Sequence, residues 1–225
     1  MDVSVVMPCR NEEKAIGECV VDAKKAIDGL GLAGEVIVVD NASTDASQLY
    51  ATLAGARVLH EPKEGYGQAC VKGINRAKGD FIVLMEGNKS YSPFEIGKFV
   101  RILQEGSDVV VGTRFKGKIE EGSMHPSRRL IGNPLLTGIF NLLFSTRFSD
   151  CYCNFRGLSR EARDRLGLEA VGKEFAAEML INAKKMGLNI AEVPINYHPK
   201  ITEPDRDLFG EGISHIQFMF RERFK

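Results

Sequence analysis

Polar side chains that could bind a charged ligand follow three short apolar segments of the sequence. The residues are Glu12, Asp40, Glu86 and Asn88, and the segments before them are 3–8, 35–39 and 81–85. Each segment is apolar and largely β-branched, as is typical of strands covered on both faces of a parallel sheet. Because parallel strands deliver their carboxyl ends to one edge of the sheet, we expect the four side chains to surround one pocket there. Their oxygen atoms suit a hard divalent cation, so the pattern indicates an active site.

The stretch from 112 to 165 adds positive charge to the chain. It contains ten Lys and Arg residues against five Asp and Glu residues. A basic region beside an acidic pocket favours an anionic ligand, and the alternative interpretation is a solvated charged surface. Arginine suits phosphate groups because its planar guanidinium group can donate two parallel hydrogen bonds. The residues of interest are Arg114, Arg128 and Arg129.

Composition limits the class of protein. The chain of 225 residues has 30 basic and 30 acidic residues, so its overall charge does not indicate a nucleic-acid partner. Its five cysteines lack zinc-site spacing and no secretory signal is evident, which predicts reduced thiols in a cytosolic protein. The longest apolar segment, 135–144, is far shorter than the ~20 residues that span a bilayer. We expect the helix around it to belong to the core or to lie at a bilayer surface.

Helical periodicity separates the apolar segments and predicts the fold class. The expected helices are 12–30, a helix after Asp40 capped by Ser43 or Asp45, and 68–77, 92–103, 134–148, 160–166, 174–186 and 209–224. The further expected strands are 57–60, 108–112, 155–158 and 189–195. This alternation predicts a single α/β domain over 1–225, with a mostly parallel central sheet and helices on both faces.

Seven short motifs lie in a characteristic order along the chain. They are 6–13, 38–45, 64–69, 112–115, 131–136, 173–179 and 191–194. Together they resemble the inverting glycosyltransferases of family two, which have the Rossmann-like GT-A fold. The last four resemble the polyprenyl-phosphate branch, which includes dolichyl-phosphate mannosyl- and glucosyltransferases. The resemblance implies that 1–112 forms the nucleotide-sugar-binding half and 113–225 the acceptor-binding half.

The resemblance also implies roles for individual residues. Asp40 would accept a hydrogen bond from a uracil or guanine N–H group. The other nucleotide-binding residues would be Pro8, Arg10 and Glu12, which flank the base and ribose, and Gly65 and Gly67 in the loop under the donor. The residues that hold phosphates of donor and acceptor would be Arg114, Arg128 or Arg129, Lys200 and Arg206.

Glu86-Gly87-Asn88 stands where the family has its Asp-x-Asp metal motif. The resemblance implies a magnesium or manganese ion that bridges this motif and the donor diphosphate. Asn88 replaces a charged ligand with a neutral amide oxygen, so we expect a weakened cation site. The expected catalytic residues are Glu86, Asn88, Arg114, Arg128 and Arg129.

The implied function is transfer of a hexose from a UDP- or GDP-hexose to a polyprenyl (dolichyl-type) phosphate, with inversion. A phosphate monoester has a second pKa of ~6, so such an acceptor needs little help from a base. The enzyme would be peripheral at the cytoplasmic face of a membrane. Members of this branch often carry transmembrane helices after the region matching 218–220, so the sequence is either a soluble member or one that stops before such helices.

Two alternatives remain open at this stage. A transferase of the same fold that acts on a saccharide or another soluble acceptor would need a base, for which Glu178 and Asp150 are the candidates. A nucleotide-sugar-binding protein without turnover is the other alternative, because Glu86-Gly87-Asn88 departs from the metal motif.

Overall fold

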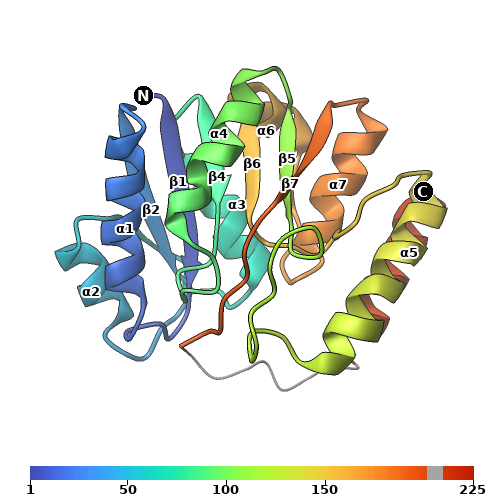
Figure 1. Ribbon diagram of the computed structural model, residues 1–225, viewed down its shortest axis with the longest axis horizontal. Coiled ribbons are helices and arrows are strands. Elements are labelled where there is room, and N and C mark those ends of the chain that lie inside the picture. Colours follow the sequence, from blue (N-terminus) through green and yellow to red (C-terminus); the bar gives the residue numbers. More distant parts are fainter. Residues whose placement is uncertain (202–209) are drawn as a thin grey trace.

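Seven strands form one central sheet in this computed structural model, which describes residues 1–201 and 210–225 (Figure 1). The strands are β1 (Val3–Cys9), β2 (Gly34–Asp40), β3 (Arg57–His60), β4 (Phe81–Leu84), β5 (Val109–Thr113), β6 (Arg156–Ser159) and β7 (Ile190–Pro194). Their order across the sheet is β3-β2-β1-β4-β6-β5-β7. β6 runs antiparallel to its neighbours β4 and β5, and the other paired strands are parallel. The prediction of a mostly parallel sheet is confirmed.

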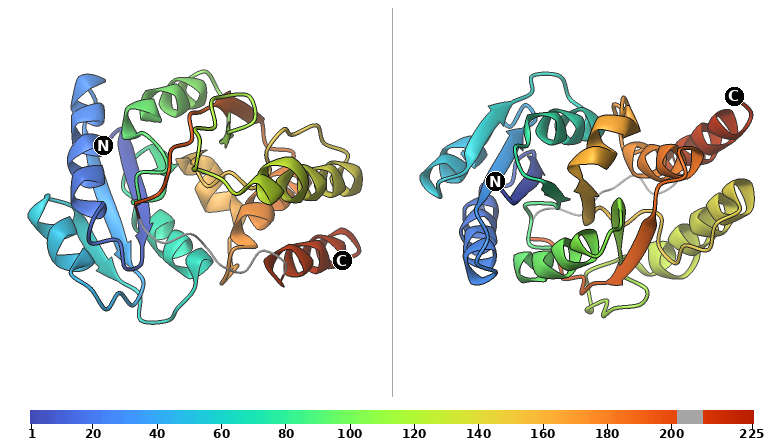
Figure 2. Two further views of the ribbon diagram at one scale, coloured as in Figure 1. Left: turned by 60° about the horizontal axis from the view of Figure 1, so that its bottom comes forward. Right: turned by 90° about the horizontal axis from the view of Figure 1, so that it is seen from above.

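Helices cover both faces of the sheet, as the sequence predicts (Figure 2). The helices around it are α1 (Ile16–Gly29), α2 (Ser47–Leu53), α3 (Tyr66–Arg76), α4 (Ile96–Gln104), α6 (Arg160–Leu166) and α7 (Phe175–Lys185). A short 3-10 turn, Pro93–Glu95, leads into α4. Figure 2 shows α1 and α4 on one face and α3, α6 and α7 on the other. Every residue of β1 and of β5 is buried, which explains why these segments are almost continuously apolar.

Helix boundaries differ from the predictions where a local contact ends or delays the helix. α1 begins at Ile16 and not at residue 12, because the preceding residues form a turn that follows the left-handed backbone of Asn11 (φ 55°). The N-cap position of α2 is Ala46 and not Ser43 or Asp45, although the Asp45 carboxylate accepts a hydrogen bond from the N–H group of Ser47, the first residue of α2, at 2.9 Å.

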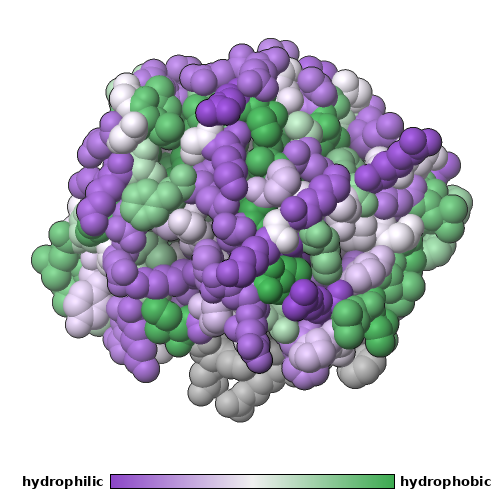
Figure 3. All heavy atoms as spheres, viewed as in Figure 1, coloured by the Kyte–Doolittle hydropathy of each residue, from purple (hydrophilic) through white to green (hydrophobic). Residues whose placement is uncertain are grey.

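Two helices of the C-terminal half lie side by side at the end of the molecule away from α1 and α2 (Figures 1 and 2). They are α5 (Asn133–Phe144), which continues a π-helical turn at Arg128–Gly132, and α8 (Gly210–Arg223). α5 ends at Phe144 and not at residue 148, because Ser145 adopts a left-handed conformation (φ 53°). Within the described ranges no helix combines the length and the apolar character that crossing a membrane requires. Figure 3 shows hydrophobic atoms gathered over α5.

The antiparallel strand β6 brings a buried arginine to the centre of the sheet. Arg156 pairs with Leu84 on one side and Val111 on the other, and its side chain is fully buried. Its guanidinium group donates to the backbone carbonyls of Cys151 (2.6 Å), Cys153 (2.8 Å) and Ala176 (2.7 Å). Arg156 therefore fixes the turn before β6 to the first part of α7.

We expect Arg156→Met to lower the free energy of unfolding by roughly 3 kcal/mol or more, because three buried carbonyl groups lose their donor at about 1–3 kcal/mol each. Urea denaturation followed by circular dichroism measures the change. The control is Arg160→Met, whose side chain is 46% exposed and pairs with Asp80 at 3.1 Å. An equal loss in the two variants would contradict the role given to Arg156.

Candidate active site

Glu86 is held at the carboxyl edge of the sheet by side chains from three segments. Its Oε1 accepts a hydrogen bond from Asn154 Nδ2 at 2.8 Å. Its Oε2 accepts from Asn88 Nδ2 at 3.1 Å and from Ser90 Oγ at 3.2 Å. Lys200 Nζ lies 3.8 Å from the same Oε2. Burial raises the pKa of Glu86, but Lys200 and the three donors outweigh this effect and lower the pKa below its ordinary value. The carboxylate is therefore charged at neutral pH.

Glu86 and Asn88 differ in how well they suit a divalent cation. Asn88 Oδ1 accepts from the N–H group of Ser90 at 3.0 Å and lies 2.6 Å from its hydroxyl oxygen, whose single proton it shares with Glu86, so this oxygen is directed at Ser90. The described residues contain no cluster of three or more His, Cys, Asp or Glu side chains that could hold a metal. Magnesium commonly binds one or two carboxylates together with substrate phosphates. Glu86 fits that mode of binding, whereas Asn88 would first have to turn away from Ser90.

Three residues beyond the carboxyl ends of strands adopt a left-handed backbone although none is glycine. Asn11 (φ 55°) follows β1, Ala42 (φ 55°) follows β2 and Lys89 (φ 66°) follows β4. Such conformations cost free energy and cluster at functional sites. The sequence carries no glycine at these positions to indicate the turns, so they were not predicted. They support a ligand site at this edge of the sheet.

Asp40 is the last residue of β2 and is 3% exposed. Its Oδ2 contacts Nδ1 of His60 at 3.2 Å. Its Oδ1 is also buried and has no hydrogen-bond partner among the residues that the structure describes. A buried carboxylate oxygen without a donor is costly, so Asp40 suits a ligand that brings a donor.

Asn41, next to Asp40, forms hydrogen bonds with the loop that follows β3. Its Nδ2 donates to the backbone carbonyls of Glu61 (3.2 Å) and Lys63 (2.6 Å), and its Oδ1 accepts from the N–H group of Gly65 (2.9 Å). Sequence reasoning assigned Asn41 no such role. A short polar side chain directly after a predicted ligand residue was the available signal.

Gly65 and Gly67 lie in this loop and at the start of α3, where the chain passes close to residues 170–172. A Cβ atom on Gly65 would lie 2.5 Å from the carbonyl oxygen of Val171, and one on Gly67 would lie 2.2 Å from that of Ala170. Gly65 also has a φ of +158°. The two glycines thus permit close packing of the loop. Their predicted contact with a nucleotide stays a prediction.

The predicted residues of the first motif lie at the end of β1 or just beyond it. Pro8 is buried within β1. The N–H group of Glu12 donates to Ser47 Oγ at 2.7 Å. Arg10 is exposed and forms an ion pair with Glu64 at 2.7 Å. This pair joins the loop after β1 to the loop after β3.

Arg114 is buried just after β5 and forms a bidentate ion pair with Asp150. Its Nε donates to Oδ2 of Asp150 at 2.7 Å and its Nη2 donates to Oδ1 at 2.8 Å. Burial lowers the pKa of Arg114, but the adjacent carboxylate outweighs this effect and raises the pKa well above its ordinary value. The guanidinium carbon lies 5.3 Å from the centroid of the Tyr197 ring. Asp150 therefore compensates much of the charge of Arg114 before a ligand binds.

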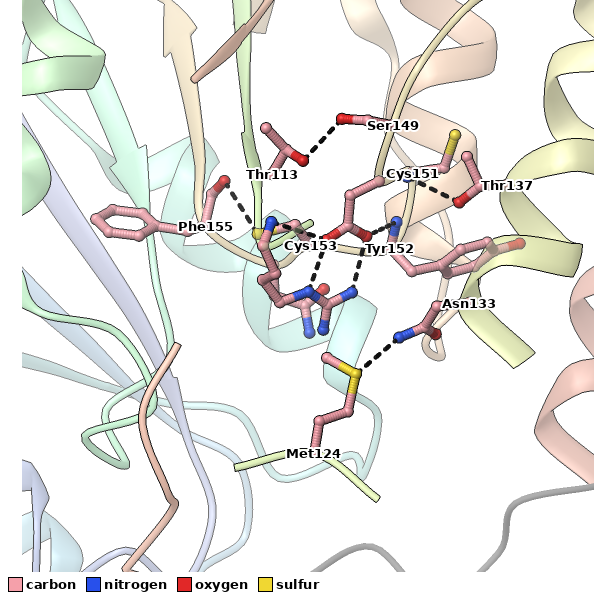
Figure 4. A network of polar contacts seen from close by, with 12 residues as sticks. Thr113, Met124, Asn133, Thr137, Ser149, Cys151, Tyr152, Cys153 and Phe155 are labelled. Atoms are coloured by element: carbon pink, nitrogen blue, oxygen red, sulfur yellow. Dashed lines mark hydrogen bonds and ion pairs between the residues drawn. The ribbon is translucent and has the colours of Figure 1, made fainter. Parts of the chain in front are cut away.

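Hydrogen bonds fix the segment around Asp150 to the sheet and to α5 (Figure 4). Thr113 Oγ1 and Ser149 Oγ lie 2.7 Å apart. The N–H group of Ser149 donates to Oε1 of Glu192, in β7, at 2.7 Å. The N–H group of Cys151 donates to Thr137 Oγ1, in α5, at 3.3 Å.

A cavity of about 840 Å³ adjoins Glu86 and reaches α5 and α8. The charged side chains in its wall are Glu86, Arg114, Arg128, Lys173 and Lys200. Its apolar wall consists mainly of Met124, Ile131, Leu135, Leu136, Ile213 and Ile216. The cavity wall therefore contains both charged and apolar side chains.

The predicted site residues differ in whether they line this cavity. Of the four polar residues expected around one pocket, Glu86 lines it, whereas Glu12, Asp40 and Asn88 do not. Arg129 is exposed and is not among the lining residues, although its neighbour Arg128 is. Arg206 lies outside the described residues.

The two carboxylates considered as catalytic bases are engaged elsewhere. Glu178 accepts hydrogen bonds from the N–H groups of Glu169 and Ala170, both at 3.0 Å, and does not line the cavity. Burial raises the pKa of Glu178 above its ordinary value. Asp150 is fully buried against Arg114. Neither carboxylate is placed to take a proton from an acceptor in the cavity.

Comparison with known proteins identifies the family. The family model described as glycosyl transferase family 2 matches residues 4–167. A dolichyl-phosphate hexose transferase of Haloferax volcanii is 32% identical over 212 residues, which cover 94% of this chain and 89% of that protein. The chain therefore belongs to glycosyl transferase family 2, and the prediction that it is a glycosyltransferase is confirmed.

Two further comparisons describe the extent of the similarity. The low-salt glycan biosynthesis hexosyltransferase Agl6 of H. volcanii is 36% identical over 218 residues, but the chain spans only about half (52%) of that relative. Glucosyl-3-phosphoglycerate synthase from Mycobacterium tuberculosis, solved with Mn²⁺, UDP-glucose and phosphoglyceric acid, has a TM-score of 0.79 at 23% identity. That match covers 99% of this chain and 80% of the solved chain. It confirms the GT-A fold.

We expect Lys200→Met to raise the pKa of Glu86, because Lys200 supplies the main charge that lowers it. Carbon-detected NMR titration of the Glu86 carboxyl group measures this shift. Ionised Glu86 stabilises the native state above its ordinary pKa of 4.5, and this stability is lost as the pH falls through the lowered native value. In Lys200→Met this contribution to stability should be smaller, because the native pKa then lies closer to the ordinary value or above it.

The control for this titration is Lys98→Met, which removes a lysine paired with Glu95 at 2.5 Å. The pKa of Glu86 should stay unchanged in this variant. An unchanged pKa in Lys200→Met as well would contradict the coupling between Lys200 and Glu86.

Proposed function

We propose that the chain transfers a hexose from a UDP- or GDP-hexose to a polyprenyl phosphate, with inversion at the anomeric carbon. The observation that carries this proposal is the cavity whose wall contains both basic and apolar side chains. A polyprenyl phosphate has two matching parts, an anionic head and a hydrocarbon tail. The 32% identity to a dolichyl-phosphate hexose transferase supports the same acceptor class.

The side chains around the cavity suit a reaction that needs no protein base. The second pKa of a phosphate monoester is ~6, so the acceptor oxygen is already a nucleophile at neutral pH. Arg128 and Lys200 in the cavity wall would position the acceptor phosphate for in-line attack on the anomeric carbon. A nucleoside diphosphate would leave as the new bond forms. The engagement of Glu178 and Asp150 elsewhere agrees with this mechanism.

We propose that Glu86 holds a magnesium or manganese ion together with the donor diphosphate. The cation would neutralise charge that develops on the leaving diphosphate. Glu86 suits this role because its lowered pKa keeps it ionised. The solved glucosyl-3-phosphoglycerate synthase binds Mn²⁺ with UDP-glucose, which supports a cation at this place in the fold. Lys200, 3.8 Å from Glu86, would have to share the carboxylate or move toward the phosphates.

We propose that α5, the turn before it and α8 face a membrane. Exposed apolar side chains gather there, among them Leu130 (72% exposed), Leu142 (83%) and Ile213 (58%). Side chains of the same elements contribute apolar surface to the cavity wall, so a lipid tail could contact them while its phosphate head reaches the basic side chains near Glu86. The cytoplasmic face is favoured because all five cysteines are free thiols, as expected in a reducing compartment.

A soluble acceptor is the second candidate, because the glucosyl-3-phosphoglycerate synthase structure contains phosphoglyceric acid. In that case the basic side chains would still contact a phosphate group, but the apolar side chains of the cavity wall would have no role. A binding protein without turnover is a weaker candidate, since Glu86 retains the ionised carboxylate that a donor-bound cation needs.

We expect Arg128→Ala to lower hexose transfer to polyprenyl phosphate at least tenfold, because a charge-assisted contact to the acceptor phosphate is lost. Arg129→Ala, which removes an exposed side chain outside the cavity wall, should lower it less than threefold. The measurement is radiolabelled hexose in the organic phase, with nucleotide affinity determined by calorimetry. Equal losses in the two variants, or a matching loss of nucleotide affinity, would count against Arg128 as an acceptor contact.

The membrane-facing surface is tested by Leu130→Glu combined with Leu142→Glu. This variant should bind anionic phospholipid vesicles at least fivefold more weakly in a sedimentation assay and should keep its nucleotide affinity. Leu49→Glu with Leu53→Glu is the matched control, because these side chains on α2 are also exposed (56% and 73%) but lie on the far side of the molecule. Equal vesicle binding by both double variants would rule out α5 as the membrane contact.

A further inference from the structure

We infer that the donor nucleotide carries uracil, and that His60 selects this base by occupying one oxygen of Asp40. The inference rests on the proposed function, in which a nucleoside-diphosphate sugar is the donor. His60 Nδ1 lies 3.2 Å from Oδ2 of Asp40. Since a carboxylate oxygen only accepts, Nδ1 carries the proton and donates to it. Oδ1, which is buried and has no hydrogen-bond partner in the described part of the chain, is left to accept from a base.

The register of the sheet places His60 beside Asp40. β2 and β3 are parallel, and Asp40 stands directly opposite His60 at their carboxyl ends. The N–H group of Glu61 donates to the carbonyl of Asp40 at 2.8 Å, which holds the two strand ends together. Lys72 also donates to the carbonyl oxygen of His60. These contacts hold the His60 main chain beside Asp40, and its imidazole is 58% exposed.

The hydrogen-bonding edges of the bases differ in what they offer a carboxylate. Uracil presents a single N–H group, at N3, between two carbonyl oxygens. Guanine presents two neighbouring N–H groups, at N1 and at the exocyclic amine, which match both oxygens of a free carboxylate. With Oδ2 already accepting from His60, the guanine amine would have to share that oxygen with the imidazole N–H group, which should lower guanine affinity by roughly tenfold. Adenine and cytosine would place a ring-nitrogen lone pair against the carboxylate.

A base can reach Asp40 only past the loops that flank β2. Oδ1 of Asp40 is enclosed, so a base reaches it only when the surrounding loops separate. The loops after β1 and β3 flank this position and are joined by the ion pair between Arg10 and Glu64, whose side chains are 48% and 62% exposed. Exposed ion pairs contribute little to stability. Arg10, once released, is available to the incoming nucleotide.

Calorimetric titration of the whole chain with UDP and with GDP, in the presence of Mn²⁺, tests the inference. The wild-type chain should bind UDP at least tenfold more tightly than GDP. His60→Ala frees Oδ2 of Asp40, so GDP should gain affinity and the preference should fall at least fivefold. His60→Gln retains a donor and should keep most of the preference. His198→Ala is the matched control, because His198 also pairs with a carboxylate, Glu120 at 3.0 Å, but elsewhere in the fold.

The outcomes distinguish this inference from the proposed function. Tighter binding of GDP, or the same UDP preference in His60→Ala as in the wild type, would overturn the role of His60. Hexose transfer from a GDP-hexose alone would overturn uracil as the base and leave the proposed function intact. Binding of neither nucleotide would overturn both.

Discussion

One enclosed carboxylate, Glu86, must stay ionised at the carboxyl edge of the sheet, and the surrounding structure meets this requirement. Burial raises the pKa of Glu86, and Lys200 together with the amide and hydroxyl donors lowers it further than burial raises it. These donors come from the turn after β4, the segment before β6 and the segment after β7. Segments distant in the sequence therefore have to meet at a single side chain. The antiparallel insertion of β6 between β4 and β5 is what brings Asn154 to it.

The two halves of the chain present different surfaces to a ligand. The strand ends of the first half offer Asp40 with a buried, unsatisfied oxygen and turns in unusual backbone conformations, which suit a nucleotide. The second half supplies most of the wall of a cavity, with both basic and apolar side chains. Tyr66, Glu86 and Tyr91 of the first half complete that wall. The division between a nucleotide half and an acceptor half remains an expectation from the sequence.

Much of the fold could be predicted from the sequence because parallel strands buried on both faces leave a strong signal. All seven strands were predicted to within one residue at each end. The pairings at the site were harder to predict, since they depend on contacts between distant segments. No local pattern indicates that Asp150 binds Arg114, that Asn154 holds Glu86 or that His60 stands opposite Asp40. The expectation that Glu12 and Asp40 would share one pocket with Glu86 assumed that the pocket follows the carboxyl edge of the sheet. The cavity beside Glu86 instead extends toward α5 and α8.

An acceptor competition experiment shows which class of acceptor receives the sugar. The chain is incubated with radiolabelled UDP- or GDP-hexoses, Mn²⁺, a polyprenyl phosphate in detergent and an equimolar soluble phosphate acceptor such as phosphoglyceric acid. The account predicts that label moves into the organic phase as a mild-acid-labile lipid phosphate sugar and that the soluble acceptor does not compete. Label that stays in the aqueous phase on the soluble acceptor would contradict transfer to a polyprenyl phosphate, because the apolar side chains of the cavity wall would then have no part in the reaction.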